Sequence, residues 1–405
     1  MMKNKKTILA CALLGLILLF AGCKSKTDDP YSHYTSEVRN QLEKADGLFF
    51  DARFPEAQKA YSEILETDEN CVDARIGLGR SLRYQGELEG ATRELKKAYE
   101  KDKTHPRACL YYGKSLMPWL GMAPKDKPEV ELVEEGIELM EDALSKDAAL
   151  FDAHTMLWPA YLYKGDVKKA NSQLVAMVEK SYFPQAVLDY GYNLLAGADE
   201  GAILFSNGDM DTYPLIALQL SEGTRTDVKV VNISLLNLPW YAVYVKDHLK
   251  VPVSLSEDEI NSLKPAQTDE GIVLVADILI DDIIGNAGDV SVYFAMVPEE
   301  KISRHCQYFS REGLLKRVKR EPVEKVFDRG KAIKNVNEVY RLNLPEEVEV
   351  WTSNLSPLTR PYEMIFYKLR YNIPRNRAGF CPGRYDRGCT YLSQEGGRSI
   401  RNLRV

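Results

Sequence analysis

The stretch LGRSLRYQGELEGATRELKKAYEKD, residues 78–102, is one unit of a repeat in which two short helices pack as a hairpin. Small residues recur 34 positions apart at Ala45, Gly79 and Gly113. Further pairs share this spacing: Ala57 and Ala91, Tyr61 and Leu95, and Ile64 and Ala98. A fixed period of this length predicts stacked repeats rather than one globular core.

This unit resembles the tetratricopeptide repeat. The matching positions are Leu78-Gly79, Leu82, Gly86, Ala91, Leu95 and Ala98. Small residues at Gly79 and Ala91 would let the two helices of a hairpin approach closely, and apolar residues at helical spacing would bury the seam between repeats. We expect an α-solenoid of four repeats over residues 38–185, with a concave surface for a peptide or protein partner.

The third repeat contains an insertion. Its second helix, ELVEEGIELMEDALSKD, begins 11 residues late, after MPWLGMAPKDKPEV at residues 117–130, and the period then resumes in a fourth unit. Insertions on one face of a solenoid often lie on a binding surface, so Trp119 and Leu120 are candidate partner contacts. The alternative is that they cap the neighbouring hairpin, and the sequence leaves both open.

The N-terminus has the pattern of an export signal. Three lysines precede the apolar run 7–20, which is short for a bilayer span and ends in Phe20-Ala21-Gly22-Cys23. This resembles a bacterial lipoprotein signal over residues 1–23, which implies a palmitate-bearing Cys23 and a chain anchored to a membrane. An uncleaved membrane anchor is the alternative. Residues 24–37 are polar and are expected to form a flexible tether.

The expected location is the bacterial cell envelope, on the periplasmic or surface side, and the outer membrane rather than the inner one. An oxidising envelope would allow Cys381 and Cys389, in CPGRYDRGC, to form a disulfide. Two reduced cysteines are the other reading, because sequence does not supply the geometry that a bridge requires.

After residue 185 the pattern changes to short apolar runs separated by helices. We expect strands at 202–206, 228–233, 290–296 and 314–318, and helices at 212–222 and 276–284. Strands that alternate with helices predict an α/β domain over residues 186–345 with a mainly parallel, Rossmann-like sheet. In such sheets ligands bind at the carboxyl ends of the strands.

Polar residues follow the first of these strands: Asn207, Gly208, Asp209, Asp211 and Thr212. Carboxylates suit a cation, a cationic group or sugar hydroxyls, so this turn is a candidate ligand site. The structural alternative is that Asp209 or Asp211 accepts backbone N–H groups of the turn and that Asp211 or Thr212 caps the next helix. No metal can be assigned from the sequence, and no cofactor is expected, since the chain has neither G-x-G-x-x-G nor a P-loop.

Three segments together resemble the soluble C-terminal region of bacterial protein O-mannosyltransferase-like multi-spanning membrane proteins. They are NGDMDTYPLIAL (207–218), EGTRTDVKVVNISLLNLPWY (222–241), and DVSVYFAM (289–296) with REGLLKRV (311–318). The resemblance spans about 120 of 405 residues. This chain lacks the family's multi-spanning module, so no transferase residue is carried over, and a role near glycans is implied only by association.

The last segment, residues 346–405, is expected to be a helix followed by a basic tail. From residue 356 onward it holds ten Lys or Arg and three acids, whereas the whole chain has a net charge of −6. Neither the overall charge nor the five histidines indicate nucleic acid or a metal centre. No nucleophile elbow or H-E-x-x-H motif is present.

These observations favour a membrane-tethered envelope lipoprotein that acts as a protein-binding scaffold or assembly factor, in a complex that handles glycans or exported proteins. The alternative is an enzyme, or an enzyme subunit, that acts on glycans or glycoproteins through Asp209 and Asp211. The expected partners are proteins, the lipid membrane and, in the alternative, a glycan.

Overall fold

The computed structural model describes residues 30–341 except 269–270, 296 and 324–325, and these form two compact units that meet between Phe183 and Pro184. Cys23, the Cys381–Cys389 pair and the basic C-terminal segment lie outside the described residues. We call the two parts the repeat unit and the α/β unit. Among the described helices, none combines the length and apolar character that crossing a membrane requires.

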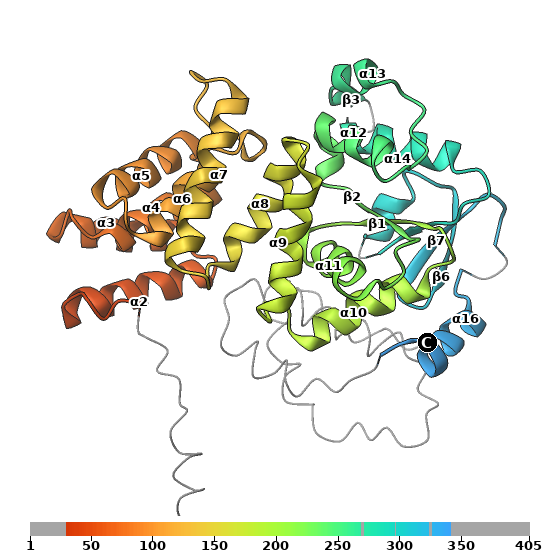
Figure 1. Ribbon diagram of the computed structural model, residues 1–405, viewed down its shortest axis with the longest axis horizontal. Helices are drawn as coiled ribbons and strands as arrows, with labels where there is room; N and C mark the ends of the chain where they lie inside the picture. The colour runs from red at the N-terminus through yellow and green to blue at the C-terminus, as the bar shows by residue number, and fades with distance from the viewer. Residues whose placement is uncertain (1–29, 269–270, 296, 324–325, 342–405) are drawn as a thin grey trace, which may run out of the picture. The chain divides into compact units, whose positions relative to one another are not determined.

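The repeat unit consists of helices that pack in consecutive pairs (Figure 1). The pairs are α2 (Ser36–Phe50) with α3 (Phe54–Thr67), α4 (Val72–Tyr84) with α5 (Leu88–Lys101), α6 (Pro106–Ser115) with α7 (Glu129–Lys146), and α8 (Phe151–Tyr163) with α9 (Val167–Glu179). The first helices of successive pairs, α2, α4, α6 and α8, also contact one another. We call the surface that they form the first-helix face. The stacking of helix pairs is that of a tetratricopeptide solenoid, as predicted.

Glycines allow the two helices of a pair to approach closely. A Cβ added to Gly79 on α4 would lie 2.7 Å from Leu95 Cγ and 3.2 Å from the carbonyl oxygen of Ala91, both on α5. In the third pair, a Cβ on Gly113 would lie 2.9 Å from the carbonyl oxygen of Gly136. Real Cβ atoms essentially never come so close, which explains the small residue at this position of the repeat.

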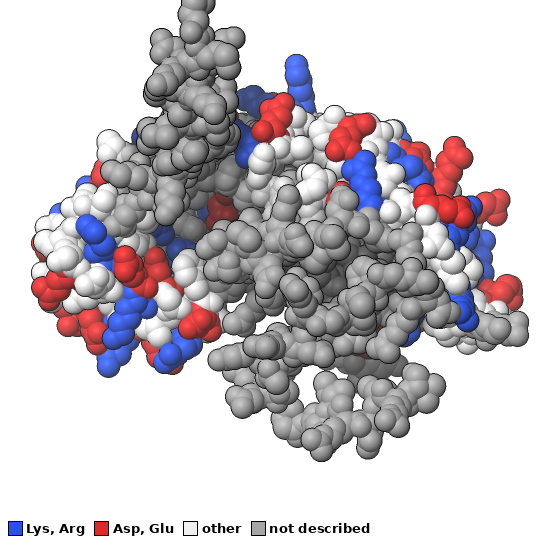
Figure 2. All heavy atoms as spheres, turned by 90° about the horizontal axis from the view of Figure 1, so that it is seen from below, with Lys and Arg blue, Asp and Glu red and all other residues white. Residues whose placement is uncertain are grey.

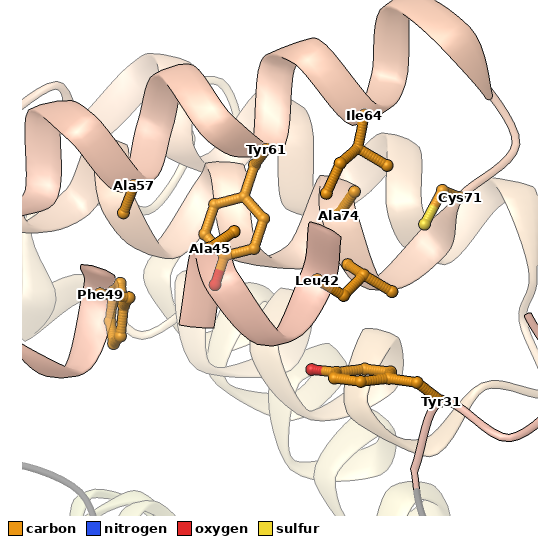
Figure 3. Close-up of a cluster of buried hydrophobic side chains, with 9 residues drawn as sticks. All are labelled: Tyr31, Leu42, Ala45, Phe49, Ala57, Tyr61, Ile64, Cys71 and Ala74. Atoms are coloured by element: carbon orange, nitrogen blue, oxygen red, sulfur yellow. The ribbon is translucent and has the colours of Figure 1, made fainter. Parts of the chain in front are cut away.

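The core of the first repeat extends to residues before α2. Leu42, Ala45, Tyr61 and Ile64 are each at most 1% exposed, and Tyr31 is 4% exposed against the same cluster (Figure 3). Thus residues 30–37, which the sequence places in the tether, lie against the repeat unit instead. The segment contains enough apolar surface in Tyr31 and Tyr34 to pack rather than remain solvated.

The insertion of the third repeat forms a short 3-10 helix, η1 (Pro118–Leu120), that is closed by Gly121 in the left-handed region at φ 68°. The hydroxyl of Thr92 on α5 donates to the carbonyl oxygen of Met122 at 2.7 Å. This bond fixes the insertion on the preceding repeat.

The α/β unit contains a five-stranded sheet in the order β2-β1-β5-β7-β6. The strands are β1 (Ile203–Ser206), β2 (Lys229–Asn232), β5 (Val292–Phe294), β6 (Tyr308–Glu312) and β7 (Leu315–Lys319). A separate two-stranded sheet pairs β3 (Ala266–Thr268) with β4 (Gly271–Val273). β1 and β5 are buried along their whole length, as continuous apolar runs predict.

The predicted α/β domain is confirmed, and its sheet is partly parallel rather than parallel through most of its strands. β1 is parallel to β2 and to β5, whereas β7 is antiparallel to both β5 and β6. The β6–β7 connection is a tight turn with Gly313 at φ 73°, too short for the crossover that a parallel neighbour needs. These two strands carry charged residues and lack the apolar run that marks a buried parallel strand.

Helices cover both faces of this sheet (Figure 1). As drawn, α10 and α11 lie below it, and α12 and α14 lie above it. The remaining elements are α10 (Gln185–Gly197), η2 (Asp209–Asp211), α11 (Tyr213–Glu222), η3 (Leu235–Asn237), α12 (Pro239–Asp247), α13 (Glu257–Ser262), α14 (Val275–Asn286), α15 (Glu299–Ile302), α16 (Arg329–Lys334) and η4 (Asn335–Val339). Gly223 ends α11 at φ 66°, as predicted.

Candidate functional site

The turn after β1 is closed by the carboxylate of Asp211. Its Oδ2 accepts the backbone N–H of Asn207 at 2.9 Å, and its Oδ1 accepts that of Gly208 at 2.7 Å. Asp211 is only 5% exposed. Both of its oxygens thus hold backbone donors that would otherwise lack partners, and Asp211 has the turn-forming role that was one of the two alternatives.

Thr212 links this turn to the next strand. Its hydroxyl donates to the carbonyl oxygen of Gly208 at 2.6 Å and accepts the side-chain N–H of Asn232, at the end of β2, at 2.9 Å. It forms no capping bond to α11, contrary to that part of the expectation. The backbone N–H of Asn232 donates to the hydroxyl of Tyr241 at 3.0 Å. These buried bonds hold the carboxyl ends of β1 and β2 together.

The outer part of the turn faces solvent. Asn207 and Asp209 are exposed, and Ser234 donates to the carbonyl oxygen of Asn207 at 2.9 Å. The predicted ligand residues are therefore contiguous, but they differ in availability: Asn207 and Asp209 are accessible, whereas Asp211 and Thr212 are engaged inside the turn. Ligand contact at this turn stays a prediction.

A second charged group lies at the carboxyl end of β5 and was not identified from the sequence. The ring of His305 lies between two carboxylates of α14, with Nδ1 2.9 Å from Asp281 and Nε2 3.4 Å from Asp277. Its side chain is 5% exposed and stacks near the ring of Phe294. Within the described residues, no group of three or more His, Cys, Asp or Glu side chains could hold a metal ion.

Arg225 and Asp227, before β2, form an ion pair at the amino end of the strands, opposite the turn after β1. Arg225 donates from Nη1 and Nη2 to three backbone carbonyls near the end of α10, at 2.9–3.0 Å: those of Leu195, Ala198 and Asp199. Its Nε and Nη2 also contact both oxygens of Asp227, at 2.9 and 2.8 Å. These hydrogen bonds from Arg225 hold the pKa of Asp227 well below its usual range.

A buried ion network fixes α16 to the sheet. Lys331 on α16 donates to Glu312 at 2.5 Å, to Asp199 at 2.9 Å and to the hydroxyl of Tyr293 at 2.9 Å. Glu312 is 1% exposed and also pairs with Lys319 at 3.1 Å. Burial alone would raise the pKa of Glu312, but Lys331 lowers it. Each of these side chains has a partner among the described residues, so the network presents no unpaired acid or base there.

Polar side chains also repeat with the helix pairs on the first-helix face. Asp46, Arg80 and Lys114 are 34 positions apart and lie on α2, α4 and α6. The guanidinium of Arg80 lies 4.2 Å from the ring centre of Phe49 on α2 and 4.9 Å from that of Tyr111 on α6. Lys114 lies 5.6 Å from the same Tyr111 ring. These cation–π contacts join three successive first helices.

Part of the first-helix face is occupied by the chain's own residues 30–34. The hydroxyl of Tyr31 donates to Asp46 on α2 and accepts from Arg107 on α6 at 3.3 Å. The hydroxyl of Tyr34 donates to Asp73 on α4 at 3.3 Å. The segment thus contacts three first helices. Burial alone would raise the pKa of Asp73, but His105 and Arg107 lower it.

Elsewhere, aromatic side chains gather where α2 and α4 end and α3 begins. Phe54 and Tyr84 stack at 4.6 Å with an interplanar angle of 9°, and Phe49 packs edge-on to both. Tyr84 is 55% exposed and Phe50 36%. We call Phe50, Arg80, Arg83 and Tyr84 the arginine–aromatic strip.

Trp119 and Leu120 are both half-buried in η1. The ring of Trp119 lies 5.9 Å from that of Tyr163, at the end of α8, with a tilt of 44°. This contact is the geometry expected if Trp119 caps the neighbouring hairpin. A partner contact at these two residues stays a prediction.

Acidic and basic side chains are interspersed on the face shown in Figure 2. Over the coloured residues of that view, no broad basic surface of the kind that nucleic acids require is seen. Charged side chains in this view therefore form small local groups rather than one charged face.

The comparisons with known proteins concern both units. Residues 187–269 match the family described as TMEM260-associated domain 2. The α/β unit contains this domain match. The matched residues include the turn after β1, the Arg225–Asp227 pair and the end of β2, and they make up about a fifth of the chain. Its span begins in α10 and overlaps the first two segments that resemble the multi-spanning membrane proteins.

Two solved structures are among those to which the chain is similar. The crystal structure of MamA is 18% identical, covers 45% of this chain and 86% of its own, and has a TM-score of 0.29. A mutant of the Thermobaculum terrenum O-GlcNAc transferase is 16% identical, covers 51% of this chain and 38% of its own, and has a TM-score of 0.31. No curated protein matches the chain.

Proposed function

We propose that this chain is a membrane-tethered lipoprotein of the bacterial cell envelope that serves as a protein-binding scaffold or assembly factor. The observation that carries the scaffold is the first-helix face of the repeat unit, where side chains at equivalent positions of successive repeats form continuous rows. Such rows suit an extended partner, because each repeat offers it the same kind of contact.

The tether rests on the lipoprotein-like segment 1–23. Its test is metabolic labelling with a palmitate analogue, in the wild type and in Cys23→Ser. The proposal expects label and membrane association in the wild type and loss of both in the variant. If the chain is soluble and unlabelled, or if Cys23→Ser keeps its lipid, the lipoprotein assignment fails.

We place the scaffold in an envelope complex that handles glycans or exported proteins. This part is supported by the resemblance of the α/β unit to the soluble region of protein O-mannosyltransferase-like proteins and by the TMEM260-associated domain match. The test is a pull-down of the tagged full chain from detergent-solubilised envelopes. A stoichiometric protein partner supports the scaffold, whereas many substoichiometric clients would indicate a chaperone instead.

The exposure of Asn207 and Asp209 at the carboxyl end of β1 favours one alternative, a glycan-related enzyme or enzyme subunit. Asp211 should be tested separately, because its substitution disturbs the turn itself. The variant Asp209→Asn distinguishes the two functions when its activity in cells, its melting temperature and its partner in the same pull-down are compared with those of the wild type. Loss of cellular function with an unchanged melting temperature and an unchanged partner supports the alternative, and an unaffected variant removes it.

A further inference from the structure

The arginine–aromatic strip has cations that the described part of the chain does not neutralise. Arg80 and Arg83 form no ion pair with a described carboxylate, whereas Lys114 pairs with Asp152 at 3.6 Å and Arg107 with Asp73 at 3.0 Å. The exposed carboxylates that follow these helices, Asp51 and Glu87, are not within ion-pair distance of either arginine.

The aromatic members of the strip are held rigidly beside these cations. Tyr84 is fixed by stacking on Phe54, and the Arg83 guanidinium lies 5.7 Å from the Tyr84 ring centre. Arg80 is fixed between Phe49 and Tyr111. An exposed ring that is already ordered loses little conformational entropy when a partner packs on it, which is the property of an interface anchor.

The neighbouring part of the first-helix face shows how a peptide is held there. Residues 30–34 lie across α2, α4 and α6 as an irregular segment, with tyrosine hydroxyls bonded to Asp46 and Asp73. In that part the helices present carboxylates to hydroxyl donors. One repeat further on, Arg80 stands at the position that Asp46 has in the first repeat, so the charge at this position is reversed.

We propose that the arginine–aromatic strip binds an extended acidic peptide segment of a partner protein. Its carboxylates pair with Arg80 and Arg83, and an apolar or aromatic side chain packs on Tyr84 and Phe50. Guanidinium groups favour carboxylates because they present parallel N–H donors to both oxygens. The inference rests on the proposed scaffold function and specifies the chemistry of its partner.

The test is selection of a random dodecapeptide library on the purified full chain, followed by affinity measurement of the enriched peptides. We expect enrichment of Asp and Glu next to aromatic or large apolar residues, and weaker binding as salt is raised. In the double variant Arg80→Gln/Arg83→Gln, affinity should fall by roughly tenfold or more. Arg80→Lys keeps the charge and should retain part of the binding.

The matched control removes the same charge from the second helix of the same repeat. Arg93→Gln/Lys96→Gln on α5 should bind the peptides as the wild type does, since both side chains are exposed on α5, outside the strip. The melting temperatures of all variants show whether a substitution has unfolded the protein, which matters most for Arg80 because it packs on Phe49. Equal loss in both double variants would overturn the assignment to the strip.

Enriched peptides without acidic residues would overturn the acidic specificity and leave the scaffold proposal standing. Failure to enrich any peptide would overturn the peptide-binding strip. The pull-down from envelopes then judges the scaffold independently, because a folded partner captured through another surface would still appear there.

Discussion

Asp209 and Asp211 are two positions apart and have different surroundings. Asp211 is buried and holds two backbone N–H groups of the turn, whereas Asp209 is exposed. Asp211, which shapes the turn, is thus less accessible to a ligand than Asp209. Any ligand at this turn would meet Asp209 and Asn207 first.

This difference predicts unequal effects of the two conservative substitutions. Asp211→Asn replaces one acceptor oxygen by a donor facing a backbone N–H, and should lower the free energy of unfolding by about 1–3 kcal/mol. Asp209→Asn should cost much less. Urea denaturation of the full chain measures both, and equal losses would contradict the turn geometry.

At the same scale, residues on which the expected resemblance to multi-spanning proteins rests have structural roles. Arg225 and Asp227 fix the end of α10, and Thr212 and Asn232 tie two strands together. Much of the motif therefore specifies a fold. Asn207 and Asp209 are its exposed part.

At the scale of the elements, the position of Gly79 decides how closely α4 and α5 pack. Gly79→Ala should lower the free energy of unfolding by about 1–3 kcal/mol, because the new methyl group would lie within 2.7 Å of Leu95 Cγ. Gly47→Ala on α2 is the matched control. A Cβ there meets nothing within 4 Å, so the substitution should be neutral or stabilising by up to about 1 kcal/mol.

Thermal or urea unfolding of the repeat unit within the full chain separates the two glycine variants. A Gly79→Ala protein as stable as Gly47→Ala would mean that the helices can move apart without cost. That result would contradict the close approach that the period of small residues predicts.

The anchoring of α16 should depend on pH. Burial alone would raise the pKa of Asp199, but hydrogen bonds from Lys331 and Ser291 lower it to about 2. A folded-state pKa below the unfolded value means that the stabilisation is complete above about pH 4 and is lost as pH falls toward 2. Asp199→Asn should therefore be less stable than the wild type near neutral pH, and the gap should narrow below pH 4.

Unfolding midpoints at several pH values between 6 and 2.5 test this, with the difference between the two proteins as the quantity of interest. Other carboxylates titrate in the same range in both proteins and largely cancel in the difference. A gap that is independent of pH would show that Asp199 stabilises α16 only through packing.

The elements that the sequence predicts well are those with a strong apolar signal. The repeat period was visible because Gly79 and Gly113 must be small, and β1 and β2 because their apolar runs are buried on both faces. β6 was missed and the direction of β7 was not anticipated, because their pattern of charged residues reflects one half-exposed edge of the sheet. The weak β3–β4 pair carried no recognisable strand pattern.

The candidate surface was only partly predictable. Asp46, Arg80 and Lys114 share the 34-residue period, so a search for polar as well as small residues at that spacing would have found the row. That Arg80 and Arg83 form no ion pair with a described carboxylate could not be foreseen, because it depends on where residues 30–34 lie on the face. Nor could the pairing of His305 with α14, which joins residues far apart in the chain.

At the scale of the whole molecule, the path of residues 30–34 should matter for partner binding. Tyr31→Phe with Tyr34→Phe removes the hydroxyls that bond Asp46 and Asp73, and should weaken the repeat unit by about 1–3 kcal/mol. It should also leave these carboxylates with fewer hydrogen-bond donors next to the strip and so weaken capture of an acidic partner. Tyr99→Phe on α5 is the control, and an effect on capture equal to that of the control would contradict the arrangement.

The docking of Pro30–Tyr34 also sets a length. From Cys23 to Pro30 there are 30 − 23 = 7 steps of the chain, which span at most about 25 Å when fully extended. With a lipid on Cys23, this short connection would keep the first-helix face within a thin layer next to the bilayer. Proteins already confined to that layer would be met at a high effective concentration, whereas freely diffusing ones would gain nothing, so modest contacts would suffice for neighbours on the same membrane.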